Sequence, residues 1–184
     1  TADFGARSFG VITGSTIDDV DGGSDALQTT GTLLLTSTGA VGSGGDPFAL
    51  NVSNLGLTTG AADITNSSAL TVIDSTVTGA LGLATTSGNL AINAITATGL
   101  TVTLNAAGAI TDANGATSNI DATTLDATAA SGIDLDTTIA MLTAAGGAGA
   151  IDISDVDALT VTSATTTDGA ITIAAGNTLT ATLL

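Results

Sequence analysis

The sequence predicts an all-β fold, a parallel β-solenoid in which each coil takes about 20 residues. The first observation is a glycine followed within two residues by an aliphatic residue, a phrase that returns at intervals near 20 residues. Its aliphatic positions are Leu90, Ile110, Ile133, Ile151 and Ile171. A repeat of this length marks a unit that buries its apolar face against its neighbours, so we expect these five side chains to form one inward ladder.

The second observation is a strand-like phrase between the copies of the first. Apolar residues alternate there with Thr, Ala or Asp at a period of two, which puts apolar side chains on one side of a strand. No stretch shows the apolar spacing of an amphipathic helix. We expect at least two strands per coil and a second inward ladder of Leu100, Leu142, Leu159 and Leu179. About eight or nine coils spaced by about 4.8 Å would make a rod about 40 Å long.

The composition fits a narrow interior. Of the 184 residues, 43% are hydrophobic but only 2% are aromatic, with no Trp or Tyr. An ordinary globular core uses large rings to fill irregular volume, whereas a narrow solenoid has room for ladders of Leu, Ile, Val and Ala. Thr makes up about a fifth of the chain and suits the outward face of strands. The positive mean hydropathy argues against intrinsic disorder.

The charge is one-sided: 17 acidic residues, all Asp, stand against a single cation, Arg7, for a formal net charge of −16. Such a surface has almost nothing to neutralise phosphates, which excludes nucleic acid as a partner, and an anionic membrane surface would repel it. No apolar run approaches the length of a transmembrane helix, so we expect no insertion into a membrane. Acidic surfaces without Lys keep secreted proteins soluble and attract divalent cations.

The residue types also limit catalysis. The chain has no His, Cys or Lys, which excludes Ser-His-Asp and Cys-His catalysis and Schiff-base chemistry. A pair of Asp carboxylates could still hydrolyse glycosidic bonds, as in some parallel β-helix enzymes, but the chain has few of the Arg, Lys or aromatic groups that grip sugars. We therefore predict a protein that is not an enzyme, with no catalytic residues and no organic cofactor site.

One acidic segment has the spacing of a metal loop. Asp19, Asp21 and Asp25 surround a pair of glycines in a D-x-D-G-x-x-D pattern, which lets hard oxygens converge around a turn as Ca²⁺ requires. The pattern lacks the bidentate Glu of an EF-hand and the G-G-x-G-x-D run of an RTX repeat. Two interpretations stay open: a calcium site at these three residues, and an ordinary solvated acidic turn.

Like charges are also expected to meet on the outside of the solenoid. Asp134 and Asp152 follow Ile133 and Ile151, and therefore occupy equivalent outward positions. In adjacent coils their carboxylates would lie about 5 Å apart, where repulsion is appreciable. Water and salt, outward splaying or a cation must relieve it.

The chain divides at residue 26. Residues 1–26 hold two of the three Phe residues, the single Arg and the densest run of Asp, and we interpret them as an atypical first coil or a junction or cap. Over residues 27–184 the strand phrases follow one another without a linker, which indicates one domain of solenoid repeats. The last phrase stops without a polar capping segment, so we expect either a solenoid that continues in a longer protein or copies that stack end to end.

The phrases resemble a known kind of repeat. Residues 44–55, 88–94, 108–115 and 132–137 are similar to the repeats of very large bacterial surface proteins of the filamentous-haemagglutinin-like, β-strand-repeat type. The resemblance covers roughly residues 27–184 at the level of repeat style. It implies a right-handed parallel β-helix that is exported to the cell surface or secreted and acts as an adhesin, stalk or filament. It brings no catalytic residues, and the chain shows no secretion domain of that group, which leaves the export route open.

These observations predict a structural or adhesive segment of an extracellular bacterial surface protein or filament. The expected partners are other protein chains or copies of itself at the solenoid ends, and a host or neighbouring cell surface. The alternatives are a filament subunit that stacks end to end, and a calcium-dependent or ice-binding solenoid. Thr-x-Thr phrases at 101–103, 160–162 and 180–182 suggest ice binding as an alternative. Leu125 and Leu142 interrupt these phrases, so we expect no continuous Thr ladder there.

Overall fold

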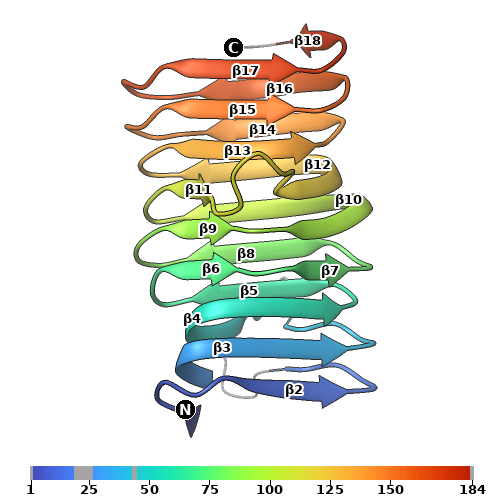
Figure 1. Ribbon diagram of the computed structural model, residues 1–184, viewed down its shortest axis with the longest axis vertical. Helices are drawn as coiled ribbons and strands as arrows, with labels where there is room; N and C mark the ends of the chain where they lie inside the picture. The colour runs from blue at the N-terminus through green and yellow to red at the C-terminus, as the bar shows by residue number, and fades with distance from the viewer. Residues whose placement is uncertain (1, 19–26, 43–44, 183–184) are drawn as a thin grey trace.

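The computed structural model describes residues 2–18, 27–42 and 45–182. They wind as parallel strands into a β-solenoid of about eight turns, roughly 20 residues apart, which confirms the predicted fold class (Figure 1). No helix occurs in these ranges. In Figure 1 the strands nearest the viewer run from left to right as the chain climbs, so the winding is right-handed.

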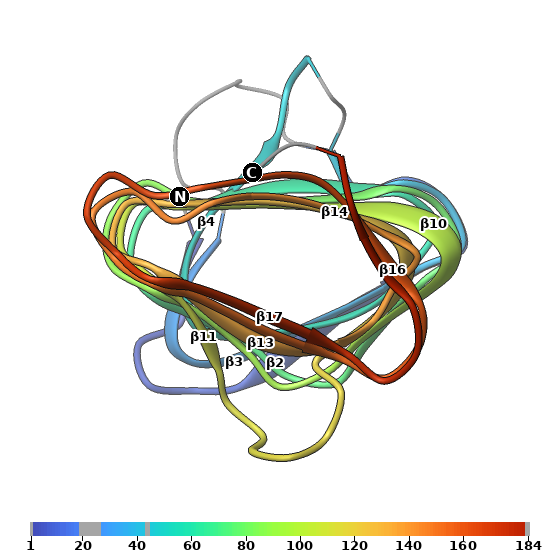
Figure 2. The ribbon, with the colours of Figure 1, turned by 90° about the horizontal axis from the view of Figure 1, so that it is seen from above.

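Seen along its axis, the solenoid is a flattened tube with two broad faces (Figure 2). We call the face nearest the viewer in Figure 1 the front face and the opposite one the rear face. The front-face strands are β2 (Phe9–Thr13), β6 (Leu70–Val72), β7 (Ser75–Val77), β9 (Leu90–Ile92), β11 (Ile110–Asp112), β13 (Ile133–Thr138), β15 (Ile151–Asp155) and β17 (Ile171–Ala175). The rear-face strands are β1 (Ala2–Asp3), β5 (Ala62–Asn66), β8 (Leu81–Thr85), β14 (Met141–Ala145), β16 (Leu159–Thr165) and β18 (Leu179–Ala181). The long strands that bend from one face to the other are β3 (Leu27–Ser37), β4 (Phe48–Thr59), β10 (Ile95–Ala106) and β12 (Ile120–Ala129).

The strand register confirms the first predicted ladder. On the front face Leu90 pairs with Ile110, Ile110 with Ile133, Ile133 with Ile151 and Ile151 with Ile171. The first four of these side chains are at most 2% exposed. Aliphatic residues stack on one another here because each coil offers the next the same apolar surface at a spacing of about 4.8 Å.

The second predicted ladder is wrong in part. Leu159 pairs with Leu179 as expected, but Leu142 pairs with Val161, two residues further along the chain than Leu159. Leu100 falls at a register shift in β10 and is only partly buried. The ladder that forms on the rear face contains Val102, Leu125, Leu142, Val161 and Ala181. Register shifts in β10 and between β14 and β16 make the coils unequal in length. Counting residues in a repeat of about 20 therefore does not detect a shift of two residues in the strand pairing.

The core is a continuous stack of aliphatic side chains along the solenoid. Phe48 lies inside it, 4% exposed, whereas Phe4 and Phe9 stack on each other at the N-terminal end with 4.0 Å between ring centroids. At the other end the last coil is more open: Ile171 is 40% exposed and Leu179 is 46% exposed. Each inner coil is thus covered on both sides, and the last described coil on one.

Glycine begins the repeated phrase because successive coils approach closely there. A Cβ on Gly149 would lie 2.1 Å from the carbonyl oxygen of Ser131, and one on Gly169 would lie 2.0 Å from that of Gly149. Gly132 has a φ of +112°, a conformation that L side chains rarely adopt. The glycine of the phrase is therefore required by the close backbone contact between coils as well as by the turn.

Candidate functional site

The outer surface of the solenoid is built from columns of equivalent residues. Side chains alternate in and out along each strand, and the parallel register places each outward residue beside its equivalent in the next coil. The candidates for function are therefore outward columns, the hollows between them and the loops that project from the tube.

An acidic column lies on the front face over β13 and β15. Asp134 pairs with Asp152 and both are exposed, as predicted. Partial burial raises the pKa of Asp134 above its usual range, and the charges of Asp152, Asp112 and Asp136 raise it further. The column therefore holds like charges that oppose ionisation of Asp134.

The residues predicted to bind calcium, Asp19, Asp21 and Asp25, lie outside the described residues, so the calcium site stays a prediction. Of the described residues on either side of them, Ile17 pairs with Val41 and Leu27 pairs with Leu50. Among the described residues, no group of three or more carboxylates is placed to hold a metal ion.

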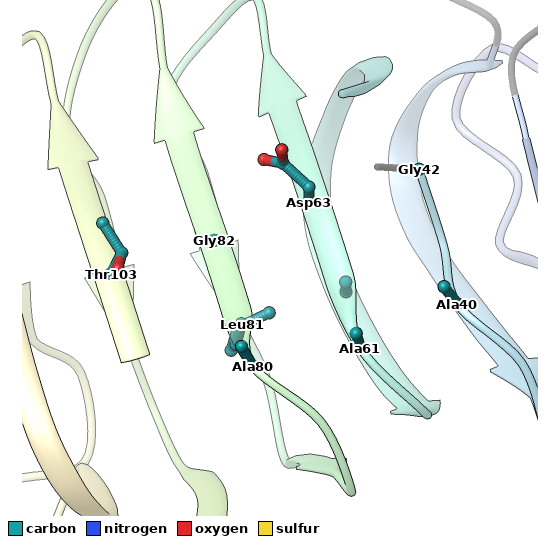
Figure 3. A pocket seen from close by; sticks show the side chains of 9 residues that line it. Ala40, Gly42, Ala61, Asp63, Ala80, Leu81, Gly82 and Thr103 are labelled. Atoms are coloured by element: carbon teal, nitrogen blue, oxygen red, sulfur yellow. The ribbon is translucent and has the colours of Figure 1, made fainter. Parts of the chain in front are cut away.

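A shallow hollow of about 530 Å³ crosses the rear face (Figure 3). Asp63 supplies a carboxylate and Thr103 a hydroxyl, and burial raises the pKa of Asp63. The rest of the lining is small or aliphatic: Ala40, Gly42, Ala61, Ala62, Ala80, Leu81 and Gly82. Hydrolysis of a glycosidic bond needs a second acid or base beside the first, and the lining of this hollow offers none.

Residues 113–118 form a loop that projects from the front face between β11 and β12 (Figure 2). Asp112 holds the start of the loop, because its Oδ1 accepts a hydrogen bond of 2.7 Å from the backbone N–H of Asn114. Asn119 closes the end of the loop: its fully buried amide donates to Oδ1 of Asp112 at 2.7 Å and to the carbonyl of Ile92 at 2.9 Å. The loop is thus a preformed projection on a regular face, the kind of insertion that marks the binding side of many repeat proteins.

The predicted Thr-x-Thr phrases on the rear face do not form a continuous ladder, as expected. Thr101 pairs with Thr124, but Met141 takes the next position in the column. The prediction that Leu125 and Leu142 interrupt this ladder is wrong, because both side chains point inward and are fully buried. Adjacent residues of a strand point to opposite faces, so a Thr that lies next to an inward Leu belongs to the outward column.

An unbroken Thr column lies on the front face instead. Thr36 pairs with Thr58, Thr58 with Thr76, and Thr76 with Thr96. The sequence-based predictions did not include this column. The signal that could have found it is the Thr-x-Thr spacing, which begins at three of these four positions.

Among the described residues, none belongs to a helix that is long and apolar enough to cross a membrane. Comparisons with family models, with curated proteins and with solved structures find no match to this chain.

Proposed function

We propose that this chain is a stiff structural segment with an adhesive outer surface, part of an extracellular bacterial surface protein or filament. The observation that carries the proposal is the uninterrupted stack: parallel pairing continues from β1 on β3 to β16 on β18 around one apolar core. Such a stack resists bending, because a bend must open backbone hydrogen bonds and apolar contacts between coils. The segment would hold its two ends about 40 Å apart.

The surface chemistry supports a role outside the cell that does not depend on catalysis. A net charge of −16 resists aggregation of a long β-rich chain, and the absence of Cys removes any dependence on redox state. Binding would use outward columns and the loop at residues 113–118, which together present an extended surface. His, Cys and Lys nucleophiles and bases are missing from the sequence, which favours a structural over an enzymatic role.

Stiffness can be tested by spin labelling, because the chain has no native Cys to remove. Ile12→Cys in β2, where Ile12 is 82% exposed, and Thr172→Cys in β17 place two outward labels on the front face near opposite ends. A stiff rod predicts one narrow distance distribution at about 40 Å by electron double resonance, from about eight coil spacings and the offset of the two labels along the strands. A broad distribution would contradict the rod.

Adhesion can be tested with coated beads. Beads that carry the chain should attach to bacterial cells and to one another more often, under flow, than beads that carry a globular protein of similar size and net charge. The matched control separates adhesion through an ordered surface from general charge effects. Equal attachment of the two kinds of bead would contradict the adhesive part of the proposal.

A second candidate is a filament subunit whose copies stack end to end. In this candidate another copy would cover Ile171 and Leu179, which are 40% and 46% exposed, whereas Ile151 and Leu159 one coil earlier are 0% and 1% exposed. A head-to-tail contact would bury these side chains and, unless it closed into a ring, would build a filament. Sedimentation velocity over a concentration range should then show association that Leu179→Asp abolishes. A wild-type chain that stays monomeric at high concentration would contradict this candidate.

A further inference from the structure

The front-face Thr column has a fixed spacing along the solenoid. Thr36, Thr58, Thr76 and Thr96 lie in register on four successive coils, at the ends of β3 and β4, in β7 and at the start of β10 (Figure 1). Thr36 is half-buried and the other three are exposed. Parallel pairing separates neighbouring hydroxyls by about 4.8 Å, so the column is about 14 Å long.

A second row of Thr runs beside the first, two residues further along each coil. Thr38, Thr78 and Thr98 are exposed there, and Gly60 occupies the remaining position. Thr38, Gly60 and Thr78 lie in the bends that follow β3, β4 and β7, and Thr98 lies within β10, so strand pairing fixes the regular spacing of the first row only. A hollow of about 300 Å³ lies between the rows and is lined by Ser37, Thr38, Thr58, Thr59, Gly60, Thr76 and Thr78. We call these two rows the Thr grid.

The hydroxyls of the first row are available to solvent. In the part of the chain that the structure describes, no hydrogen bond joins the hydroxyl of Thr36, Thr58, Thr76 or Thr96 to another protein group. All three hydroxyls of the second row are held by the protein instead. Thr38 donates to the carbonyl of Gly14 at 2.7 Å, Thr78 to the carbonyl of Thr59 at 3.5 Å and Thr98 to a carboxylate oxygen of Asp121 at 3.0 Å.

The Thr grid is stiff. Thr is branched at Cβ, so its χ1 angle has few options, and both the methyl and the hydroxyl group keep fixed directions. The residues between the two rows are buried, and one of them, Thr59, donates a hydrogen bond of 3.0 Å to the carbonyl of Gly39 in the preceding coil. The spacing of the outward groups in the first row is therefore set by the backbone ladder and not by mobile side chains.

We propose that the Thr grid binds the surface of ice. The oxygen atoms of ice form rows whose repeat along one axis is close to the coil spacing, so the free hydroxyls can take lattice positions while the methyl groups exclude liquid water between them. A preorganised grid loses little entropy on binding an ordered surface. A protein partner would use aromatic or Arg anchors, and the Thr grid offers hydroxyl and methyl groups only. The inference does not depend on the adhesive role, because a rod that fails to bind cells can still bind ice.

The test compares two substitutions in the same local sequence. Thr76 and Thr101 are both exposed and both begin a Thr-Val-Thr phrase, but Thr76 lies in the Thr grid and Thr101 lies on the rear face. We expect the wild-type chain to show thermal hysteresis and to inhibit ice recrystallisation. Thr76→Tyr should lose both activities, because the ring lifts the lattice off the grid, and Thr101→Tyr should keep them. Circular dichroism and thermal unfolding check that each variant is folded, and Thr96→Tyr replaces Thr76→Tyr if the latter misfolds.

Three results would overturn the inference. The first is a folded wild-type chain with no effect on ice crystals, and the second is an equal loss of activity in the folded Thr76→Tyr and Thr101→Tyr variants. The third is adsorption to microcrystalline chitin without any effect on ice, which would assign the Thr grid to a crystalline polysaccharide.

Discussion

At the scale of single residues, Asp155 holds a carboxylate inside the aliphatic stack at 4% exposure. Its Oδ2 accepts hydrogen bonds from the Thr137 hydroxyl and the Ile139 N–H, both at 2.9 Å, and its Oδ1 accepts one from the Asp157 N–H at 2.9 Å. A carboxylate buried without donors would cost several kcal/mol, so these three bonds are what make the position tolerable. The core therefore accepts polar residues where strands turn, provided that nearby groups are donors.

Asp134 lacks such compensation and gives a prediction. Its pKa is raised by burial first and then by Asp152 and two further carboxylates, so the ionised form weakens the folded state. Asp134→Asn keeps the shape and removes the charge. We expect it to stabilise the protein at neutral pH by a few tenths of a kcal/mol, the scale of like charges that face each other on a sheet surface. Thermal unfolding at pH 7 measures the gain.

The pH dependence of this gain has a definite sign. Because the folded pKa of Asp134 lies above its ordinary value of 3.8, its contribution to stability is largest below that value and is lost as the pH rises through the folded pKa. The difference between Asp134→Asn and wild type should therefore be present at neutral pH and vanish on acidification below the ordinary value. Asp168→Asn, in an exposed turn, removes the same formal charge as a control. Equal gains from the two variants would contradict a specific cause at Asp134.

At the scale of elements, the sequence predicts the front-face ladder and only part of the rear-face one. The glycine phrase marks each front strand at the same point, so counting from glycine aligns Leu90 with Ile110 and onward. The rear strands follow corners of different length, and bulges in them cannot be read from alternation. A shift of two residues leaves a side chain on the same face of the strand. The alternation therefore predicts that Leu142 and Leu159 both point inward, but it does not show that they belong to different ladders.

The same limit applies to the candidate sites. The Asp134 and Asp152 pair could be predicted because both follow residues of the front ladder. The front-face Thr column could not be aligned from spacing alone, because three of its four members belong to strands that bend around a corner. The loop at residues 113–118 has a local signal, the turn-prone Asn114-Gly115 pair, but only the buried contact of Asn119 with Asp112 shows that the loop is fixed at both ends.

The glycine phrase gives a prediction at this scale. A Cβ at Gly149 would lie 2.1 Å from the Ser131 carbonyl oxygen, and a backbone neighbour cannot move aside without shifting a coil. We expect Gly149→Ala to lower the free energy of unfolding by about 1–3 kcal/mol, as for other overpacked sites. Urea denaturation measures it. Gly14→Ala is the control, because nothing lies within 4 Å of a Cβ there. Similar urea midpoints for the two variants would mean that the coils are free to separate at Gly149.

At the scale of the whole molecule, contacts run between neighbouring coils. The front-face strands pair in the order β9, β11, β13, β15 and β17, each with the one before and the one after. The free energy of unfolding of such a stack is close to a sum over the single coils and the contacts between neighbouring coils. A substitution that unfolds one coil therefore affects distant coils only through the coils between them. The coils at both ends of the described range have a neighbour on one side only, because β2 pairs with β3 alone and β17 with β15 alone.

Ile151→Asp tests this view of the stack. Ile151 is 0% exposed between Ile133 and Ile171, so a carboxylate there would be buried without a partner at a cost of several kcal/mol. Because local unfolding spreads only from one coil to its neighbours, we expect hydrogen exchange to accelerate over residues 141–182 and to stay near wild type over residues 48–106. Ile171→Asp is the control: Ile171 is already 40% exposed, so the charge stays hydrated and only the last coil should open. Equal acceleration along the whole chain would show that the solenoid unfolds as one cooperative unit, and an unchanged melting temperature would remove Ile151 from the buried ladder.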